Sequence, residues 1–203
     1  YGGKWEKSKF TGIEVTGKVL GVFGYGNIGK ITADRAQGLK MRVMVFDPFL
    51  TAEIAAKNGV ELVTKEKLFE RADYITVHVP LNDSTRNLIN KNTIETMKTG
   101  VRIINCARGG IVNESDLIEG LDSGKIAGAA IDVFEEEPPP QDNPLLKHDS
   151  VICTPHLGAS TAEAQVNVAV QVAEQIRDYL ISGEIRNSLN CPSISSEMEK
   201  VLS

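Results

Sequence analysis

Three closely spaced glycines follow a short apolar run and constrain the fold of this chain more than any other feature. Gly24, Gly26 and Gly29 have the spacing G-x-G-x-x-G within the stretch VFGYGNIGK. The spacing alone also occurs in ordinary turns, so its neighbours must decide what it means. A nucleotide cradle needs a strand before the glycines, a helix after them and a second strand that ends at an acid.

The sequence around the glycines supplies this context. The apolar, β-branched run 18–23 predicts a buried strand, and apolar or small residues at helical spacing predict a helix over 27–39. A second apolar run, 41–47, stops at Asp47. In such a unit the first glycine permits the tight turn, the second lets the backbone approach a pyrophosphate, and the third allows close helix packing. The stretch therefore predicts a nucleotide cradle.

The same unit indicates which nucleotide is bound. A helix that begins near Asn27 directs its first amides and the positive end of its dipole toward phosphate groups. Asp47 lies 18 residues after Gly29, where a carboxylate can accept hydrogen bonds from the adenosine ribose. The same carboxylate would repel a 2′-phosphate, so we expect NAD rather than NADP.

Strands and helices alternate through the rest of the chain, which favours a parallel sheet with helices on both faces. Asn113 is a plausible N-cap for one helix, and Ser160 with Glu163 forms a capping box for the last. Further strands are predicted at 73–79, 101–107, 127–134 and 150–154, and helices at 51–59, 65–72, 91–98, 113–125 and 160–182. The predicted class is α/β, a doubly wound parallel sheet (Rossmann fold), with one cofactor-binding domain over 1–183 and a tail over 184–203.

Composition excludes several other classes. With 203 residues and a net charge of -5, the chain has no basic excess that would indicate nucleic-acid binding. Its apolar runs are shorter than the roughly 20 residues that cross a bilayer. Cys106, Cys153 and Cys191 form no C-x-x-C pair, so neither disulfides nor a metal site are predicted. A reducing, cytoplasmic compartment is expected.

Two side chains at predicted strand ends suit hydride transfer to a 2-keto acid. That reaction needs a cation to hold the carboxylate and an acid to protonate the carbonyl oxygen. Arg108 follows the apolar run 101–105, and His156 follows the run VICTP. An arbitrary arginine or histidine is more often structural, but ligands of open α/β sheets bind at the carboxyl ends of strands.

Other titratable residues remain open. His148 is expected on a surface loop and His78 at a strand end near the cofactor. A carboxylate that partners His156 could come from the stretch DVFEEEPPP, and spacing does not choose among its acids. These acids are Asp132, Glu135, Glu136 and Glu137.

Four motifs in order, GKVLGVFGYGNIGK, NCARGGIVNESDL, AGAAIDVFEEEPP and TPHLGASTAEAQ, span about 17–165. Together they resemble the D-isomer-specific 2-hydroxyacid dehydrogenases. The resemblance implies the NAD-binding domain of an oxidoreductase that moves a hydride between NAD(H) and a small D-2-hydroxy or 2-keto acid. The favoured pair is 3-phosphoglycerate and 3-phosphohydroxypyruvate.

The resemblance also implies roles for individual residues. Arg108 would bind the substrate carboxylate, His156 would be the acid-base, and Glu137 would keep that histidine protonated. The cofactor contacts it implies are Gly24, Gly26, Asn27, Ile28, Gly29, Asp47, Val79, Cys106, Ala107, Arg108, Asp132, His156, Gly158 and Ala159.

The sequence departs from the family in extent, because members begin with a substrate-binding domain and this sequence starts after it. Val79 also stands where related sequences often have threonine. The opening GGKWEK, which contains Trp5, resembles a dimer-contacting segment, so a homodimer or higher homo-oligomer is expected. Alternatives are a lactate or glycerate dehydrogenase, a NAD-sensing corepressor-like module, or a fragment that only binds nucleotide.

Overall fold

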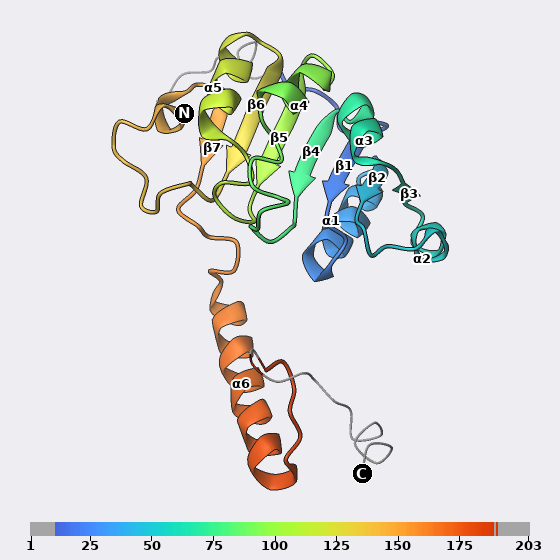
Figure 1. Ribbon diagram of the computed structural model, residues 1–203, viewed down its shortest axis with the longest axis vertical. Coiled ribbons are helices and arrows are strands. Elements are labelled where there is room, and N and C mark those ends of the chain that lie inside the picture. The colour runs from blue at the N-terminus through green and yellow to red at the C-terminus, as the bar shows by residue number, and fades with distance from the viewer. Residues whose placement is uncertain (1–10, 189, 191–203) are drawn as a thin grey trace. The chain divides into compact units, whose positions relative to one another are not determined.

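A seven-stranded parallel sheet forms the centre of the protein in a computed structural model, which describes residues 11–188 and residue 190 (Figure 1). The strand order is β3-β2-β1-β4-β5-β6-β7, and every pair is parallel. The strands are β1 Val19–Phe23, β2 Arg42–Phe46, β3 Glu61–Leu62, β4 Tyr74–Val77, β5 Val101–Asn105, β6 Ile126–Ile131 and β7 Val151–Cys153. Chain order reverses between β1 and β4, which confirms the predicted doubly wound sheet.

Helices connect these strands, and short polar residues cap several of them. The helices are α1 Asn27–Gly38, α2 Ala52–Lys57, α3 Lys65–Arg71, α4 Lys91–Thr96, α5 Glu114–Asp122 and α6 Ala162–Ser182, with a 3₁₀ helix, η2, at Pro144–Lys147. The Asn113 side chain accepts from the Asp116 amide at 2.9 Å, so the predicted cap of α5 is confirmed.

The cap predicted for α6 is wrong by one residue. Thr161, not Ser160, is the N-cap, and its hydroxyl accepts from the Ala164 amide at 3.0 Å. The Ser160 amide instead donates to the Leu157 carbonyl at 2.9 Å in the preceding turn. That turn places Ser160 one residue outside the helix, which leaves the capping position to Thr161.

Two apolar clusters cover opposite faces of the sheet. The larger includes Leu68 and Phe69 of α3, Ile94 of α4 and Leu117 of α5. The smaller joins the other face of β1 and β2 to α1 and α2; its buried members are Leu20, Val22, Ala33, Ala36, Val43, Val45, Ala55 and Val60. The glycine turn after β1 therefore lies on a strand that is packed from both sides.

Several boundaries differ from the predictions. The predicted strand 127–134 ends at Ile131, because β7 pairs with β6 only through Ile131. Asp132 therefore lies beyond the sheet edge. The strand β3 was not predicted, since its two residues are exposed edge positions without apolar alternation, and η2 was not predicted either.

The described chain forms two compact units, one ending at His156 and one beginning at Leu157. Helix α6 lies in the second unit, and the domain boundary expected after residue 183 stays a prediction. Trp5, Cys191 and the segment 191–203 lie outside the described residues. In the described part, none of the helices has the length and apolar character required to cross a membrane.

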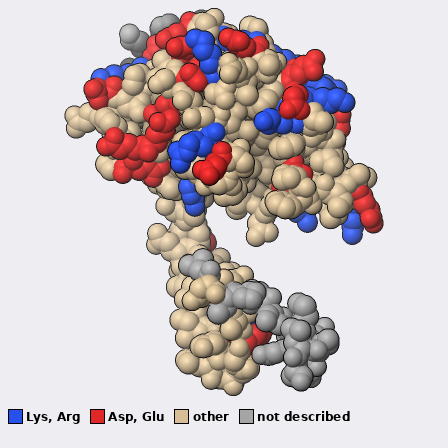
Figure 2. Space-filling model, viewed as in Figure 1, with Lys and Arg blue, Asp and Glu red and all other residues tan. Residues whose placement is uncertain are grey.

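Charged side chains of both signs are interspersed over the face of the first unit that Figure 2 shows. The Lys and Arg residues visible there do not merge into one continuous basic surface. This face therefore has no feature typical of a surface that tracks a phosphate backbone.

Candidate active site

The glycine loop has the geometry of a phosphate cradle. Gly24 has φ +88°, and a side chain there would lie 2.6 Å from the His78 carbonyl oxygen. A side chain on Gly29 would lie 2.0 Å from the carbonyl oxygen of Gly24. Gly26, by contrast, has open space where its side chain would be. Two glycines therefore close the turn, and the third leaves room for a group to approach the backbone.

The first turn of α1 faces outward without a side-chain cap. Gly26 is the N-cap and supplies no side-chain hydrogen bond, and the first turn contains no acidic residue. Asn27 and Ile28 are exposed there, with Ile28 at 63%. Uncapped amides at the positive end of a helix dipole bind anions, so this turn fits a pyrophosphate.

Asp47 lies half-buried directly after β2 and has a role that was not predicted. Its Oδ2 accepts from the Tyr25 amide at 2.6 Å, and its Oδ1 accepts from the Phe49 amide at 2.8 Å. The carboxylate thus ties the end of β2 to the glycine loop. A carboxylate at this place also fits a ribose rather than a 2′-phosphate.

The end of β4 packs directly against the glycine loop. A side-chain carbon on Gly24 would lie 2.9 Å from Cγ1 of Val79, so this valine borders the glycine loop. His78 lies in the same segment, and its Nε2 is 3.1 Å from the hydroxyl of Thr76. Burial lowers the pKa of His78, so its ring is neutral at pH 7 and supplies no cation to the loop.

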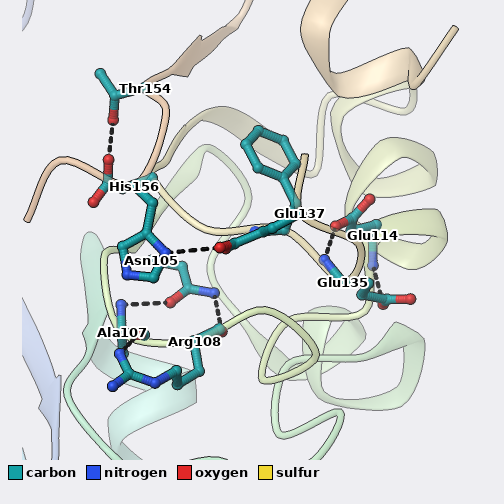
Figure 3. A network of polar contacts seen from close by, with 10 residues as sticks. Asn105, Ala107, Arg108, Glu114, Glu135, Glu137, Thr154 and His156 are labelled. Atoms are coloured by element: carbon teal, nitrogen blue, oxygen red, sulfur yellow. Dashed lines mark hydrogen bonds and ion pairs between the residues drawn. The ribbon is translucent and has the colours of Figure 1, made fainter. Parts of the chain in front are cut away.

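Asn105 organises the loop that carries Arg108. The Asn105 side chain is 2% exposed; its Oδ1 accepts from the Ala107 amide at 3.0 Å and its Nδ2 donates to the Arg108 carbonyl at 2.9 Å (Figure 3). Gly109 lies close to the loop that follows β6. A side chain on Gly109 would lie 1.7 Å from the Phe134 carbonyl oxygen. Arg108 itself is exposed, and its guanidinium donates to the Ala107 carbonyl at 2.5 Å.

Cys106 is exposed at the end of β5, in the same loop. Partial burial of the sulfur and the nearby carboxylate of Asp132 both raise the pKa of the Cys106 thiol. The thiol is therefore protonated at neutral pH and is a poor nucleophile. Its position beside Arg108 suits an uncharged side chain that lines the site.

His156 and Glu137 form a close pair. His156 Nδ1 lies 2.7 Å from Glu137 Oε2, and both side chains are partly exposed (Figure 3). The hydrogen bond from His156 and then the bond from the Phe134 amide hold the pKa of Glu137 below its usual value, with a further contribution from the charge of Arg108. The acid-base candidate, its carboxylate and the candidate cation therefore belong to one electrostatic site.

The neighbouring acid Glu135 is engaged elsewhere. Its amide donates to Glu114 Oε1 at 2.7 Å, and its own carboxylate accepts from the Glu114 amide at 3.4 Å. Asn143 donates to the other oxygen of Glu114 at 2.9 Å. Among the acids that the sequence left open, Glu137 is the one whose carboxylate contacts His156.

Asp132 is 3% exposed, directly after β6. Its Oδ1 accepts from the Thr154 hydroxyl at 2.5 Å, and its charge acts on Cys106. Thr154 was not singled out from the sequence, because a single threonine after a strand carries no periodic signal. Gly158 and Ala159 lie in a turn of the second unit and are described with that unit alone.

Together these residues could hold a dinucleotide along one edge of the sheet. The glycine loop and Asp47 suit the pyrophosphate and ribose, and the ends of β5, β6 and β7 bring Arg108 and His156 to that edge. The sequence-predicted residues of the first unit thus gather at the carboxyl ends of the strands, where open α/β sheets bind ligands.

Comparisons with known proteins agree with this arrangement. A family model described as D-isomer specific 2-hydroxyacid dehydrogenase, NAD binding domain, matches residues 1–158. The chain is 50% identical over 194 residues to a D-3-phosphoglycerate dehydrogenase of Bacillus subtilis, which covers 96% of this chain and 37% of that protein. A D-3-phosphoglycerate dehydrogenase of Archaeoglobus fulgidus is also 50% identical, over 95% of this chain and 36% of its own length. The chain thus spans little more than a third of these relatives.

Solved structures show the same fold. A glyoxylate reductase from Paecilomyes thermophila superposes with a TM-score of 0.81 at 32% identity, over 88% of this chain and 54% of that one. A D-2-hydroxyisocaproate dehydrogenase superposes with a TM-score of 0.81 at 29% identity, over 86% and 56%. Through its NAD-binding domain, the chain therefore belongs to the family of D-isomer specific 2-hydroxyacid dehydrogenases.

Proposed function

We propose that this chain is the NAD-binding domain of a D-3-phosphoglycerate dehydrogenase. The complete enzyme would transfer a hydride between NAD(H) and C2 of 3-phosphoglycerate or 3-phosphohydroxypyruvate, in serine biosynthesis. The observation that carries the proposal is the 2.7 Å pair of His156 and Glu137, with Arg108 near enough to act on the same carboxylate. The substrate is supported by relatives of that name at 50% identity.

Three side chains would divide the work on the substrate. The Arg108 guanidinium would bind the substrate carboxylate through paired, charge-assisted hydrogen bonds. His156 would donate a proton from Nε2 to the oxygen at C2 during reduction and accept it during oxidation. Glu137, on Nδ1, would hold the ring in orientation.

The cofactor would be held mainly by residues that follow β1 and β2. The α1 N-terminus would bind the pyrophosphate, and Asp47 the adenosine ribose. Bound NAD supplies the hydride acceptor, and NADH the donor. Asp132 and Cys106 would line the nicotinamide end, where the protonated thiol adds no charge.

Two measurements test this function. The first is a fluorescence titration of the purified chain with NADH and with NADPH, where tighter binding of NADH is expected. The second follows NADH absorbance after addition of 3-phosphohydroxypyruvate, for the chain and for a full-length enzyme that contains it. NADH binding without consumption by the full-length enzyme would refute the assigned substrate and leave the cofactor assignment intact.

A substrate panel separates this proposal from other members of the family. Glyoxylate, pyruvate and hydroxypyruvate would be compared with 3-phosphohydroxypyruvate at equal concentration in the full-length enzyme. The expected order has the phosphorylated substrate first by at least tenfold in kcat/KM, equivalent to about 1.4 kcal/mol. Preference for glyoxylate would instead favour a reductase of the kind named among the structural relatives.

We further propose that the enzyme is a cytoplasmic homodimer. The segment GGKWEK supports the dimer by its resemblance to a dimer-contacting segment. Free thiols at Cys106 and Cys153 support a reducing compartment. Sedimentation of the purified protein measures its oligomeric state, and a monomer at every concentration would exclude the dimer. Cell fractionation measures the compartment.

A further inference from the structure

Thr154 makes a short hydrogen bond to a buried carboxylate of the site. Its hydroxyl donates to Asp132 Oδ1 at 2.5 Å (Figure 3), and Asp132 is 3% exposed. A carboxylate so far removed from water depends on its hydrogen-bond donors, because burying a charge without them is costly. The Thr154 hydroxyl is therefore a structural requirement of Asp132.

The same two residues also hold the backbone of His156. The His156 amide donates to the Asp132 carbonyl at 2.8 Å and to the Thr154 carbonyl at 3.1 Å. His156 has φ +54°, the left-handed region that a residue with a side chain adopts only when its surroundings impose it. Asp132 and Thr154 supply that constraint.

A third bond joins the strands that carry these residues. The Thr154 amide donates to the Ile131 carbonyl at 3.0 Å, one residue before Asp132. The end of β6 and the segment after β7 are thus connected by backbone bonds and by one side-chain bond. Only the side-chain bond can be removed by substitution without altering the backbone.

We propose that Thr154 is a positioning residue, which acts through Asp132 to fix the turn of His156 and keep its imidazole within reach of Glu137. The consequence for turnover rests on the proposed function, since it requires His156 to be the acid-base. Loss of the hydroxyl leaves Asp132 with one donor fewer in a buried place. The carboxylate then rotates or draws in water, and the turn held by its carbonyl relaxes.

The test compares Thr154→Val with Thr154→Ser in the 203-residue chain. Valine keeps the shape of threonine without the hydroxyl, whereas serine keeps the hydroxyl. The readout is the titration of the Glu137 carboxyl carbon by NMR, because the hydrogen bond from His156 is the largest cause that lowers the pKa of Glu137. The Phe134 amide and the charge of Arg108 also lower the pKa of Glu137, whereas the hydrogen bonds of Thr154 run to Asp132, Ile131 and His156.

In Thr154→Val the pKa of Glu137 is expected to rise toward its ordinary value, while Thr154→Ser should retain the value of the parent chain. Thr93→Val is the matched control. It removes a partly buried hydroxyl from the capping box of α4, so it lowers the melting temperature without touching the site. An unchanged Glu137 titration in folded Thr154→Val would overturn the proposal.

A second variant and a kinetic measurement complete the test of Thr154. If Thr154→Val does not fold, Thr154→Ala removes the same hydroxyl without placing a methyl group against the carboxylate, and the same prediction applies. In the full-length enzyme, Thr154→Val should lower kcat about tenfold to a hundredfold with little change in KM for the keto acid. Because the titration needs no substrate, a full-length enzyme inactive on 3-phosphohydroxypyruvate refutes the proposed function without deciding the role of Thr154.

Discussion

The carboxylate of Asp47 accepts a hydrogen bond from the Tyr25 amide at 2.6 Å, which joins the residue directly after β2 to the middle of the glycine loop. The second oxygen accepts from Phe49 at 2.8 Å. Asp47 therefore shapes the loop in addition to its proposed contact with the ribose, and a substitution there should have two separable effects.

Asp47→Asn should reduce the preference for NADH over NADPH, because it removes the negative charge and keeps one acceptor oxygen. Asp47→Ala should also lower NADH affinity, because it removes the oxygen that accepts from the Tyr25 amide of the glycine loop. The loss of a hydrogen bond to a charged group corresponds to about 1.5–3 kcal/mol. Fluorescence titrations with both nucleotides measure the two effects, and an unchanged preference in Asp47→Asn would exclude the ribose role.

Gly109→Ala should destabilise the fold strongly, because its Cβ would lie 1.7 Å from the Phe134 carbonyl oxygen. Overpacking of this kind costs about 1–3 kcal/mol, or more where backbone must move. Gly38→Ala is the matched control, since nothing lies within 4 Å of a side chain there. Urea unfolding of both variants gives the comparison; equal stabilities would show that the two loops separate easily.

Glu137→Gln should change the dependence of stability on pH. Because the pKa of Glu137 is lowered in the folded state, its ionisation stabilises the fold above the unfolded pKa of about 4.3. That stabilisation is lost as the pH falls through the lowered value. The free energies of unfolding of the parent and Glu137→Gln should therefore differ most near neutral pH and converge in acid.

The effect will be small, because the Glu137 side chain is 37% exposed and solvent screens the pair. Glu136→Gln is the control and should follow the parent curve. A Glu137→Gln curve that runs parallel to the parent at every pH would show that the pair contributes nothing to folding.

His156→Ala in the full-length enzyme should lower kcat about 10²- to 10⁴-fold, the usual contribution of a positioned proton donor. NADH affinity should change little, because the residues proposed to hold the phosphates and the ribose follow β1 and β2, whereas His156 follows β7. Steady-state kinetics and a binding titration are both needed. Unaltered turnover would remove His156 from the mechanism.

Cys106 should react slowly with iodoacetamide at neutral pH and faster as the pH rises, because burial and then Asp132 raise the pKa of its thiol. Asp132→Asn should accelerate the reaction at a fixed pH by removing the second of these causes. The rate is measured by mass spectrometry in a chain with Cys153 and Cys191 replaced by serine. Identical rates with and without Asp132→Asn would place the carboxylate away from the sulfur.

Local patterns in the sequence predict the scaffold well and the contacts between loops poorly. The helix α1 and the strands beside it follow from the glycine spacing and from apolar runs, which are local signals. Asn105 and Thr154 bond to residues whose proximity depends on how strand ends meet. The sequence next to Asn105 and Thr154 therefore does not predict these hydrogen bonds.

The choice of Glu137 illustrates the same limit. Sequence spacing left four acids as candidate partners of His156. The resemblance to a known family was the basis for selecting Glu137. In the structure the choice depends on the direction of the chain after Phe134, whose amide bonds Glu137 while the next residue, Glu135, turns toward Glu114. Adjacent positions in one acidic run thus face different neighbours.

The contact between Gly109 and the Phe134 carbonyl has a mechanical consequence. With no side chain between them, the loop of Arg108 and Gly109 and the loop of Phe134 and Glu137 pack backbone against backbone. Because closely packed groups transmit strain, we expect a displacement of one loop to shift the other. We therefore expect Arg108 and Glu137 to move as a unit. A motion that brings this edge of the sheet against a bound molecule would position both side chains in one step.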